Sequence, residues 1–358
     1  MNIDELDTKQ RVLLKVAHGA PVAESDLRGL CFDHAPLAAA VFHKLDLRGV
    51  SFRGADLREA VIDGCSLAGA SFDGALMRGA TVNACPADRS AWVGTSMRNS
   101  RIIGSSLRGA DFRDADLNLA AIIQCDLEEA SASNALVDRC TFSAVKLGRA
   151  RLNGIAFRQA TFAECSLDGA VFDGASFALV VFHKTPLRGR SFAGQTWNGC
   201  QFMECDLSGA DFSEAHLRQS NFKGATLDGV RFTGSQAANA LFVEAAGEGC
   251  DFSRANLQQA LFNGSRWKQG RFDGAYLHQA FFTAATLEAC SLRDADLTYA
   301  DFAQAQLGRC DFQGSTLFRT NFHRADEGGS RFGDRTAALG TQAELARAET
   351  WTPAATAR

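Results

Sequence analysis

The sequence has no excess of charge of either sign, with 37 Lys and Arg against 41 Asp and Glu and a formal net charge of −4. It also has no apolar stretch near the ~20 residues that a membrane span needs, and no basic start followed by an apolar run. A near-neutral chain does not indicate a nucleic-acid binder or a strong polyanion. We therefore expect no direct nucleic-acid partner, no membrane partner and no secretory signal.

Catalytic and cofactor motifs are missing as well. The sequence contains no Walker or dinucleotide loop, no zinc-finger spacing and no nucleophile elbow, and its seven histidines are dispersed. Asp and Glu are abundant, but they recur at regular intervals, which explains them without catalysis. We expect no enzyme, no cofactor, no metal and no small-molecule substrate.

Apolar residues recur instead at every fifth position. An unbroken frame of 62 centres runs from Leu27 to Phe332. The residue two places before each centre, here called the inward slot, is nearly always Ala, Cys, Ser, Thr or Val. The period fits neither a helix nor a strand, and a fixed repeat is typical of a solenoid. The weak centres are Ala87, Ala132, Ala237, Gly247 and Glu327.

A period of five implies winding. A centre and its inward slot alternate as on a short strand, so both point to the same side. The next two residues often end in glycine, as in a tight turn. Such a chain buries its apolar side only by coiling around it. Centres alternate between mainly Leu and mainly Phe, which favours four sides per coil and about fifteen coils. We name the sides by their centres: first (Leu27, Leu47), second (Phe32, Phe52), third (Leu37, Leu57, Met77) and fourth (Phe42, Ile62, Val82).

The repeated units resemble the pentapeptide-repeat family, in which A-[D/N]-L-x-x recurs. The resemblance covers residues 25–332 and implies an all-β fold, a right-handed quadrilateral parallel β-helix. The matching units include Ala55-Asp56-Leu57, Ala115-Asp116-Leu117, Ala255-Asn256-Leu257 and Ala295-Asp296-Leu297.

The ends leave the repeat. Residues 1–24 are predicted to form an N-terminal capping element with a helix over 3–18, which carries an apolar stripe of Leu6, Leu13, Val16 and Ala17. It has candidate capping boxes at Asn2 with Glu5 and at Asp7 with Gln10. A partner-docking helix is the alternative. The tail, 333–358, is predicted to cap the other end or to mediate dimerisation, with a short helix over 337–350.

Three stretches, 85–101, 131–140 and 235–250, keep the frame but lose the consensus. We expect bulged or loosened coils there. Domain boundaries are the alternative.

Ten of the eleven cysteines, all except Cys31, occupy inward slots that Ala fills elsewhere. Cysteine there acts as a small apolar residue. We expect reduced, structural thiols and a cytoplasmic location, with a metal or redox role as the alternative.

Two outward surfaces are candidate binding sites. On the fourth side Leu241, Leu261 and Phe281 should stack on consecutive coils, with Val243 beside them, and on the third side lie Tyr276, Tyr299 and Phe318. A contiguous exposed apolar patch often marks an interface, so we expect a protein partner or a second copy there. The second candidate is a ladder of Arg58, Arg78 and Arg98 on the third side, which would suit an acidic partner.

A spacing of 140 residues also relates His43, His183 and His323, which places all three on the fourth side. They would lie too far apart to share a metal. An internal duplication or chance explains the spacing, and repeated contact points are the alternative.

Two functions follow from the resemblance. The first is a non-enzymatic scaffold or adaptor, a rigid rod that binds a protein partner. Some family members accompany bacterial type VI secretion components, and the helix leading into Asp26-Leu27-Arg28-Gly29 is similar to that group. The alternative is a DNA mimic acting on DNA gyrase or topoisomerase, as dimeric acidic family members do. The near-neutral repeat region departs from that pattern.

Overall fold

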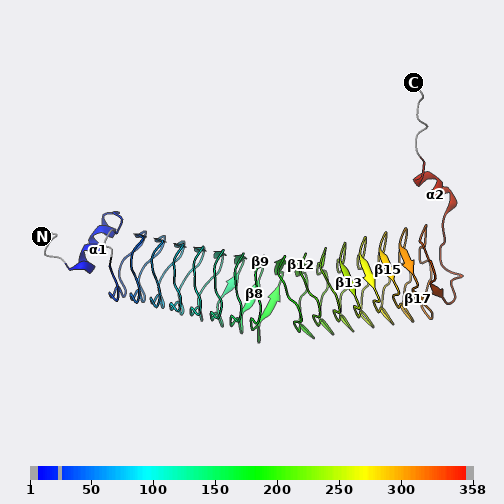
Figure 1. The fold of residues 1–358 in the computed structure, drawn as a ribbon, viewed down its shortest axis with the longest axis horizontal. Coiled ribbons are helices and arrows are strands. Elements are labelled where there is room, and N and C mark those ends of the chain that lie inside the picture. Colours follow the sequence, from blue (N-terminus) through cyan, green and yellow to red (C-terminus); the bar gives the residue numbers. More distant parts are fainter. Residues whose placement is uncertain (1–6, 23–25, 352–358) are drawn as a thin grey trace, which may run out of the picture. The chain divides into compact units, whose positions relative to one another are not determined.

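The fold is a parallel β-solenoid of about 15 turns with short terminal helices, as predicted. The computed structural model describes residues 7–22 and 26–351. The chain divides into two compact units, unit 1 from Met1 to Pro186 and unit 2 from Leu187 to Arg358. Figure 1 shows the stacked coils of each unit, with the strands drawn as arrows.

The described residues of unit 1 form one helix and eleven short strands. They are α1 (Thr8–Ala17), β1 (Val41–His43), β2 (Val61–Asp63), β3 (Thr81–Asn83), β4 (Arg101–Ile103), β5 (Ala121–Ile123), β6 (Val137–Asp138), β7 (Thr141–Ser143), β8 (Ala156–Arg158), β9 (Thr161–Ala163), β10 (Ser176–Ala178) and β11 (Val181–His183). Unit 2 contains β12 (Gln201–Met203), β13 (Ala246–Glu248), β14 (Arg266–Lys268), β15 (Thr286–Glu288), β16 (Gln306–Gly308), β17 (Asp311–Phe312), β18 (Arg331–Phe332) and α2 (Ala343–Glu349).

Strands on successive coils pair in parallel with an offset of 20 residues. On the fourth side of unit 1, Phe42 of β1 lies opposite Ile62 of β2. On the first side of unit 2, Trp267 of β14 lies opposite Leu287 of β15. Twenty residues per coil and five per side give four sides, which confirms the geometry expected from the period.

Centres and inward slots fill the interior of both units. In unit 2 the phenylalanines of the second and fourth sides form two walls of stacked rings. Phe262 and Phe282 on the fourth side lie 4.5 Å apart and nearly parallel, whereas Phe252 on the second side meets Phe262 edge-on at 86°. The expected division into Phe-rich and Leu-rich walls is therefore found here, in stacked and edge-to-face geometries that aromatic rings prefer.

The second-side wall of unit 1 is interrupted. Phe72, Trp92 and Phe112 stack in order, but the next centre on that side is Ala132. An apolar cavity of about 20 Å³ lies beside Ala132 and is lined by residues that include Phe112, Leu127 and Phe142. Alanine is too small to fill the space that an aromatic centre occupies in neighbouring coils.

The corners between sides are β-turns of an unusual kind. The residue two places after a centre has a positive φ, as at Gly229 (φ 63). The N–H of the following inward slot donates to the carbonyl of the centre in most corners, as from Val230 to Leu227 at 3.1 Å. This is the type II arrangement that favours glycine, yet many other residues adopt it, including Tyr299 (φ 58). Repeated coil-to-coil bonding therefore overrides the local preference.

The prediction of loosened coils at 85–101, 131–140 and 235–250 is wrong. All three stretches keep regular turns and buried inward slots. Trp92 is fully buried and stacks on Phe72 at 4.0 Å. At Gly247 an added Cβ would lie 2.5 Å from Cys250 Sγ, so the cysteine fills the space of the missing side chain. Exposed or half-buried inward slots occur instead at Ala175 in unit 1 and Gln195 in unit 2.

The N-terminal helix is shorter than predicted within the described residues. It begins at Thr8 after an Asp7 N-cap, and Asp7 and Gln10 form the capping box. The Asn2–Glu5 candidate and Leu6 lie outside the described residues. The buried residue is Val12, not the expected stripe, in which Leu13 and Val16 are half-buried and Ala17 is exposed.

The C-terminal tail follows a different path from the predicted helix over 337–350. Only Ala343–Glu349 is helical (α2), while Leu339 pairs with Asn321 as a further strand position. Earlier in the tail, the Arg335 guanidinium lies 4.4 Å from the centre of the Phe332 ring and 5.3 Å from that of the Phe322 ring. Arg335 also donates to both carboxylate oxygens of Glu327, at 2.7 and 2.9 Å. One polar side chain thus covers the last aromatic rings of the core.

Candidate functional site

Most acidic positions in the repeat have a backbone role. An Asp directly before a centre accepts a hydrogen bond from the N–H two residues later, as Asp116 does from Asn118 at 3.0 Å. An Asp directly after a centre accepts instead from the next coil, as Asp33 does from Arg53 N–H at 3.1 Å. These bonds satisfy backbone donors that would otherwise lack partners, which explains the repeat's Asp and Asn.

The predicted arginine ladder occupies consecutive coils of the third side, but its members differ. Arg58 makes a two-pronged ion pair with Asp56, at 2.8 and 2.6 Å. This contact holds the pKa of the Asp56 carboxyl below its usual value. Arg78 and Arg98 are exposed, and no described acidic group lies within 4 Å of either. The ladder is therefore partly neutralised at one end.

The cysteine side chains at the inward slots are buried, whereas Cys31 is exposed. Burial raises the pKa of the Cys85 and Cys250 thiols to about 12, so these thiols stay protonated and unreactive at neutral pH. No cluster of three or more His, Cys, Asp or Glu residues suited to a metal occurs among the described residues.

The three equivalent histidines have three different environments. His43 is exposed and contacts the Asp63 carboxylate at 2.8 Å. His183 is half-buried. His323 is 3% exposed and lies beneath the chain that leads into α2. The shared spacing therefore does not give a shared role.

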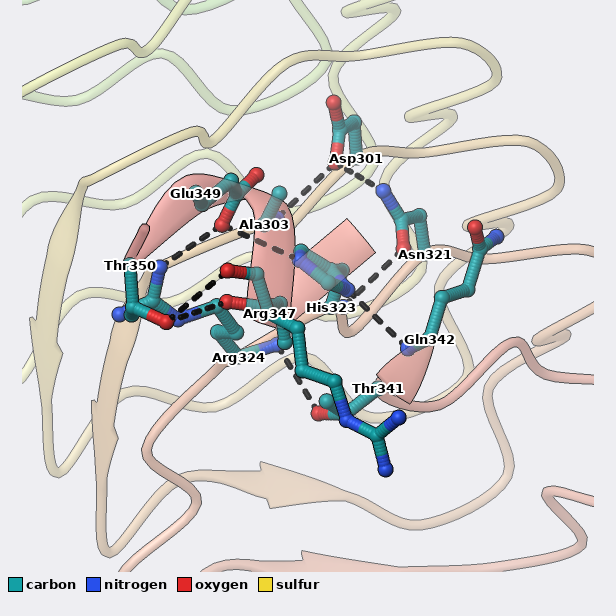
Figure 2. A network of polar contacts seen from close by, with 11 residues as sticks. Asp301, Ala303, Asn321, His323, Arg324, Thr341, Gln342, Arg347, Glu349 and Thr350 are labelled. Carbon is teal, nitrogen blue, oxygen red and sulfur yellow. Dashed lines mark hydrogen bonds and ion pairs between the residues drawn. The ribbon is translucent and has the colours of Figure 1, made fainter. Parts of the chain in front are cut away.

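His323 and Arg324 hold the C-terminal helix in place (Figure 2). The Nδ1 atom of His323 accepts from Gln342 N–H at 3.1 Å, and Nε2 lies 3.3 Å from Glu349 Oε2. Arg324 donates to the same Glu349 oxygen at 2.7 Å, and its N–H donates to the Thr341 hydroxyl. These contacts are intramolecular and bury His323. His323 is therefore not an exposed contact point for a partner, which was the alternative explanation of the 140-residue spacing.

The apolar ladder consists of Leu241, Leu261, Phe281 and Val243 on the fourth side of unit 2. Leu241 forms a parallel β-bridge with Leu261 on the next coil, and Leu261 forms one with Phe281, so the three residues stack on consecutive coils as expected. Phe281 is 40% exposed, and Leu241, Leu261 and Val243 are half-buried. The ladder presents apolar surface, and Phe281 is its most exposed member.

The aromatic cluster, on the third side of unit 2, is the most exposed group of large apolar side chains there. Tyr276, Tyr299 and Phe318 are 40%, 44% and 48% exposed. Tyr299 and Phe318 meet edge-on at 5.7 Å and 89°. His278 joins them, parallel to Tyr276 at 5.8 Å and edge-on to Tyr299 at 5.7 Å. The structure thus brings the predicted aromatic residues into one continuous cluster.

Sequence reasoning missed His278. The signal was present, because His278 and Phe318 occupy the same repeat position, one residue after a third-side centre, two coils apart. Histidines were judged as possible metal ligands rather than as aromatic rings. Their ring contacts depend on side-chain directions that a one-dimensional pattern does not give.

The cluster lies in a strip with little charge, here called the neutral strip. It comprises the outward residues of the third side from the coil centred on Ala237 to that centred on Leu317. Asp296 and Arg319 are the only Asp, Glu, Lys or Arg residues among them, and the others include Gln236, Asn239, Asn256, Gln258, Gln259, Gln279, Thr298 and Thr316. Amide side chains link neighbouring coils, as between Gln259 Nε2 and Gln279 Oε1 at 2.9 Å.

None of the described helices is long and apolar enough to cross a membrane. Larger hollows occur on the outer surface of unit 1, and their linings are polar or mixed. One of about 480 Å³ is lined by Ala68, Gly69, Asp88, Arg89, Arg108, Gly109 and Glu129. In it Arg108 pairs with Glu128 and Asp126, so its charges are largely matched. We find no catalytic grouping in it.

Sequence-family models match most of the chain. The model described as pentapeptide repeat region matches residues 195–269, and that described as pentapeptide repeats (9 copies) matches 138–181. A third, pentapeptide repeats (8 copies), matches 23–58, 40–83, 89–118, 250–294 and 295–326. A comparison with curated protein sequences gives no significant match.

Several solved structures are similar. A trypsin-treated variant of QnrB1, a plasmid-mediated fluoroquinolone resistance protein, is 20% identical over 48% of this chain and 89% of its own, with a TM-score of 0.32. HetL, a pentapeptide repeat protein involved in heterocyst differentiation regulation from the cyanobacterium Nostoc sp. strain PCC 7120, is 19% identical over 92% and 98%, with a TM-score of 0.16. A pentapeptide repeat protein from the Arabidopsis thaliana thylakoid lumen is 26% identical over 39% and 66%, with a TM-score of 0.14.

Proposed function

Since the chain belongs to the pentapeptide-repeat family, whose members are typically non-catalytic, we propose that it is a non-enzymatic scaffold that binds a protein partner through the neutral strip. The observation that carries this proposal is the aromatic cluster. Its exposed rings are not needed to fill the core, which is already complete beneath them, with Leu277, Leu297 and Ala300 fully buried. Exposed tyrosine and phenylalanine in a charge-poor surface are typical of interface centres.

The apolar ladder extends this proposal to the neighbouring side. Leu261 and Phe281 face outward on coils that also carry the neutral strip on the third side. The arginine ladder of unit 1 is a weaker candidate, because Arg58 is already paired with Asp56. A type VI secretion adaptor is a more specific form of the proposal, which the identity of the captured partner would test.

The alternative prediction of a DNA mimic requires a continuous acidic face. Instead, acidic side chains pair with arginines on the same coil, as Asp26 does with Arg28 and Asp111 with Arg113 at 2.6 Å each. Such pairs cancel the field that a mimic would need. No observation favours this second function.

Site-specific photo-cross-linking tests the proposal. A photo-reactive phenylalanine analogue would replace Thr298, between His278 and Phe318, and as a matched control Arg78, at the same repeat position in unit 1. In a lysate of the source organism, position 298 should give a discrete protein adduct that Tyr299→Ala and Phe318→Ala abolish, and position 78 should not. Equal adducts at both positions, or an adduct unaffected by the alanine variants, would contradict the proposal.

Analytical ultracentrifugation distinguishes binding of another protein from self-association of this one. The protein would be compared with the double variant Leu261→Asp/Phe281→Asp, whose outward positions leave the core intact. We expect the same monomer mass for both proteins. A wild-type dimer that becomes monomeric in the variant would assign the ladder to self-association instead.

A further inference from the structure

We infer that the neutral strip binds a proline-rich segment in the polyproline II conformation, with a basic residue at one end of that segment. This inference rests on the proposed function, in that it names the chemistry of the partner for the same surface. It draws on the arrangement of the rings, on the repeat distance of the coils and on one unpaired carboxylate.

The ring arrangement suits proline. The Tyr299 ring stands at 81° to that of His278, and the Phe318 ring stands at 89° to that of Tyr299, so successive rings are nearly perpendicular to one another. Surfaces lined by aromatic rings are the usual docking sites of proline-rich segments, which lose little entropy on binding because their helix is already formed. No charged side chain lies between Tyr276, Tyr299 and Phe318 on successive coils except Asp296.

The spacing of the coils also fits. Parallel strands on adjacent coils lie ~4.8 Å apart, so two coils span ~9.6 Å. A polyproline II helix rises ~3.1 Å per residue with three residues per turn, or ~9.3 Å per turn. His278 and Phe318 occupy the same repeat position on coils of the third side that are two apart. Successive turns of a proline-rich segment laid along the strip would therefore meet equivalent aromatic positions.

The strip also offers hydrogen-bond donors. A polyproline II segment has no internal hydrogen bonds, so its carbonyl groups need partners when they leave water. The hydroxyl of Thr298 and the amide of Gln258 occupy the same repeat position as His278 and Phe318. Tyrosine hydroxyl groups add further donors at the edge of the cluster.

One carboxylate predicts the charge of the partner. The backbone of Asp296 forms a parallel β-bridge with that of Tyr276 on the adjacent coil. The Oδ1 atom of Asp296 accepts a hydrogen bond from Thr298 N–H at 3.0 Å. Within residues 7–22 and 26–351 no Lys or Arg nitrogen lies within 4 Å of this carboxylate. A lone acid beside an aromatic surface is complementary to a basic side chain of the partner.

These 358 residues contain no such segment. The five prolines of this chain, Pro21, Pro36, Pro86, Pro186 and Pro353, are isolated from one another. No stretch of the chain could therefore supply a proline-rich ligand to a second copy.

Fluorescence anisotropy with the full-length protein tests the inference. The probe is a labelled peptide of three Ala-Pro-Pro repeats followed by lysine. We expect saturable binding, weakened at least about tenfold by Tyr299→Ala or Phe318→Ala, as for aromatic interface anchors. Asp296→Asn should weaken binding of this peptide about threefold or more but leave a peptide ending in glutamine unaffected. Arg158→Ala, at the same repeat position in unit 1 and outside both candidate surfaces, should change nothing.

Three results would overturn the inference: equal binding of a peptide with glycine in place of proline, binding unaffected by Tyr299→Ala, or no binding at all. If the peptide fails while position 298 still cross-links to a protein, the partner docks through a different structure and the proposed function stands. If maltohexaose binds with the same dependence on Tyr299 and no protein adduct forms, the strip binds neutral glycan and both proposals fail.

Discussion

One repeat position carries arginine on three consecutive coils of unit 1 and an aromatic ring on two coils of unit 2. Arg58, Arg78 and Arg98 lie one residue after the third-side centres of their coils, and His278 and Phe318 lie at the same place in theirs. The backbone around them follows the same pattern of turns and coil-to-coil bonds. The fold therefore accepts either kind of side chain at this outward position, and its identity is free to serve binding.

The interiors of the two units differ in how completely aromatic rings fill them. Inward positions are constrained in both units. In unit 2 every fourth-side centre from Phe202 to Phe322 is aromatic, and the second side lacks an aromatic ring only at Leu292, whereas the second side of unit 1 has Ala132 and Leu152 in succession beside a cavity. Unit 2 thus combines the better-filled core with the exposed aromatic surface. A rigid base beneath an exposed cluster holds its rings in place before a partner arrives, which favours binding.

The largest expected effect comes from breaking the aromatic wall of unit 2. Phe252 stacks on Phe232 at 4.7 Å and on Phe272 at 4.8 Å and is fully buried. Phe252→Ala should lower the free energy of unfolding by about 3–5 kcal/mol because it leaves a cavity. Urea unfolding followed by circular dichroism would measure this. Tyr299→Ala, at the surface, should stay within about 0.5 kcal/mol, and an equal cost for both variants would refute the distinction between wall and surface.

The second-largest expected loss of stability comes from Arg335, which covers the last aromatic rings of unit 2. Arg335→Ala should destabilise unit 2 by about 1–2 kcal/mol, since it removes the cation over Phe332 and the ion pair with Glu327. Thermal unfolding gives the measurement, and Arg319→Ala, an exposed arginine on the third side, is the control. A loss no greater than that of the control would show that the end of the core needs no cover.

Filling the gap in unit 1 should make the two units more alike. Ala132→Leu would place methyl groups in the cavity beside Phe112 and Leu127. We expect a gain of about 1 kcal/mol in unfolding free energy from the buried apolar surface, measured by urea denaturation. Ala132→Ser, which adds no apolar volume, is the control. Destabilisation by leucine would mean that the site is already packed too tightly to accept it.

The smallest expected effect comes from ion pairs and depends on pH. Arg231 donates to Asp211 at 2.7 Å and holds the pKa of that carboxyl at about 2, below its usual 3.8. A lowered pKa in the folded state contributes stability that is fully present above pH 4 and is lost as the pH falls towards 2. Asp211→Asn should therefore cost less than ~1 kcal/mol at pH 7 and progressively less as the pH falls through 2. A pH series of unfolding midpoints would show the convergence, and a constant difference across it would exclude the ion pair as the cause.

Much of the fold followed from the period of five. The inward positions, the four sides and the 20-residue offset between strands all depend on the spacing of apolar residues, which a sequence displays directly. Departures from the consensus were harder to interpret. Trp92 and Gly247 weaken the pattern, but a neighbouring ring or a cysteine side chain restores the packing. Compensation by a residue on the adjoining side or on another coil cannot be judged from one position alone.

The candidate site was only partly predictable for the same reason. Tyr276, Tyr299 and Phe318 were identified because outward positions can be counted from the frame. Their ring contacts with His278 depend on side-chain orientations. The burial of His323 depends on the C-terminal tail, which no longer follows the five-residue repeat. No break in the repeat between Pro186 and Leu187 indicates the division into two units.

The sequence by itself determined which side chains point inward, because burying one apolar residue in every five allows only a coiled chain. The tertiary structure decided how those residues fill space and which outward ones meet. Van der Waals packing and ring contacts act between residues about 20 positions apart, and a side chain's direction there is set by its neighbours above and below. Phe252 against Phe272 and Tyr299 against Phe318 are both contacts of this kind.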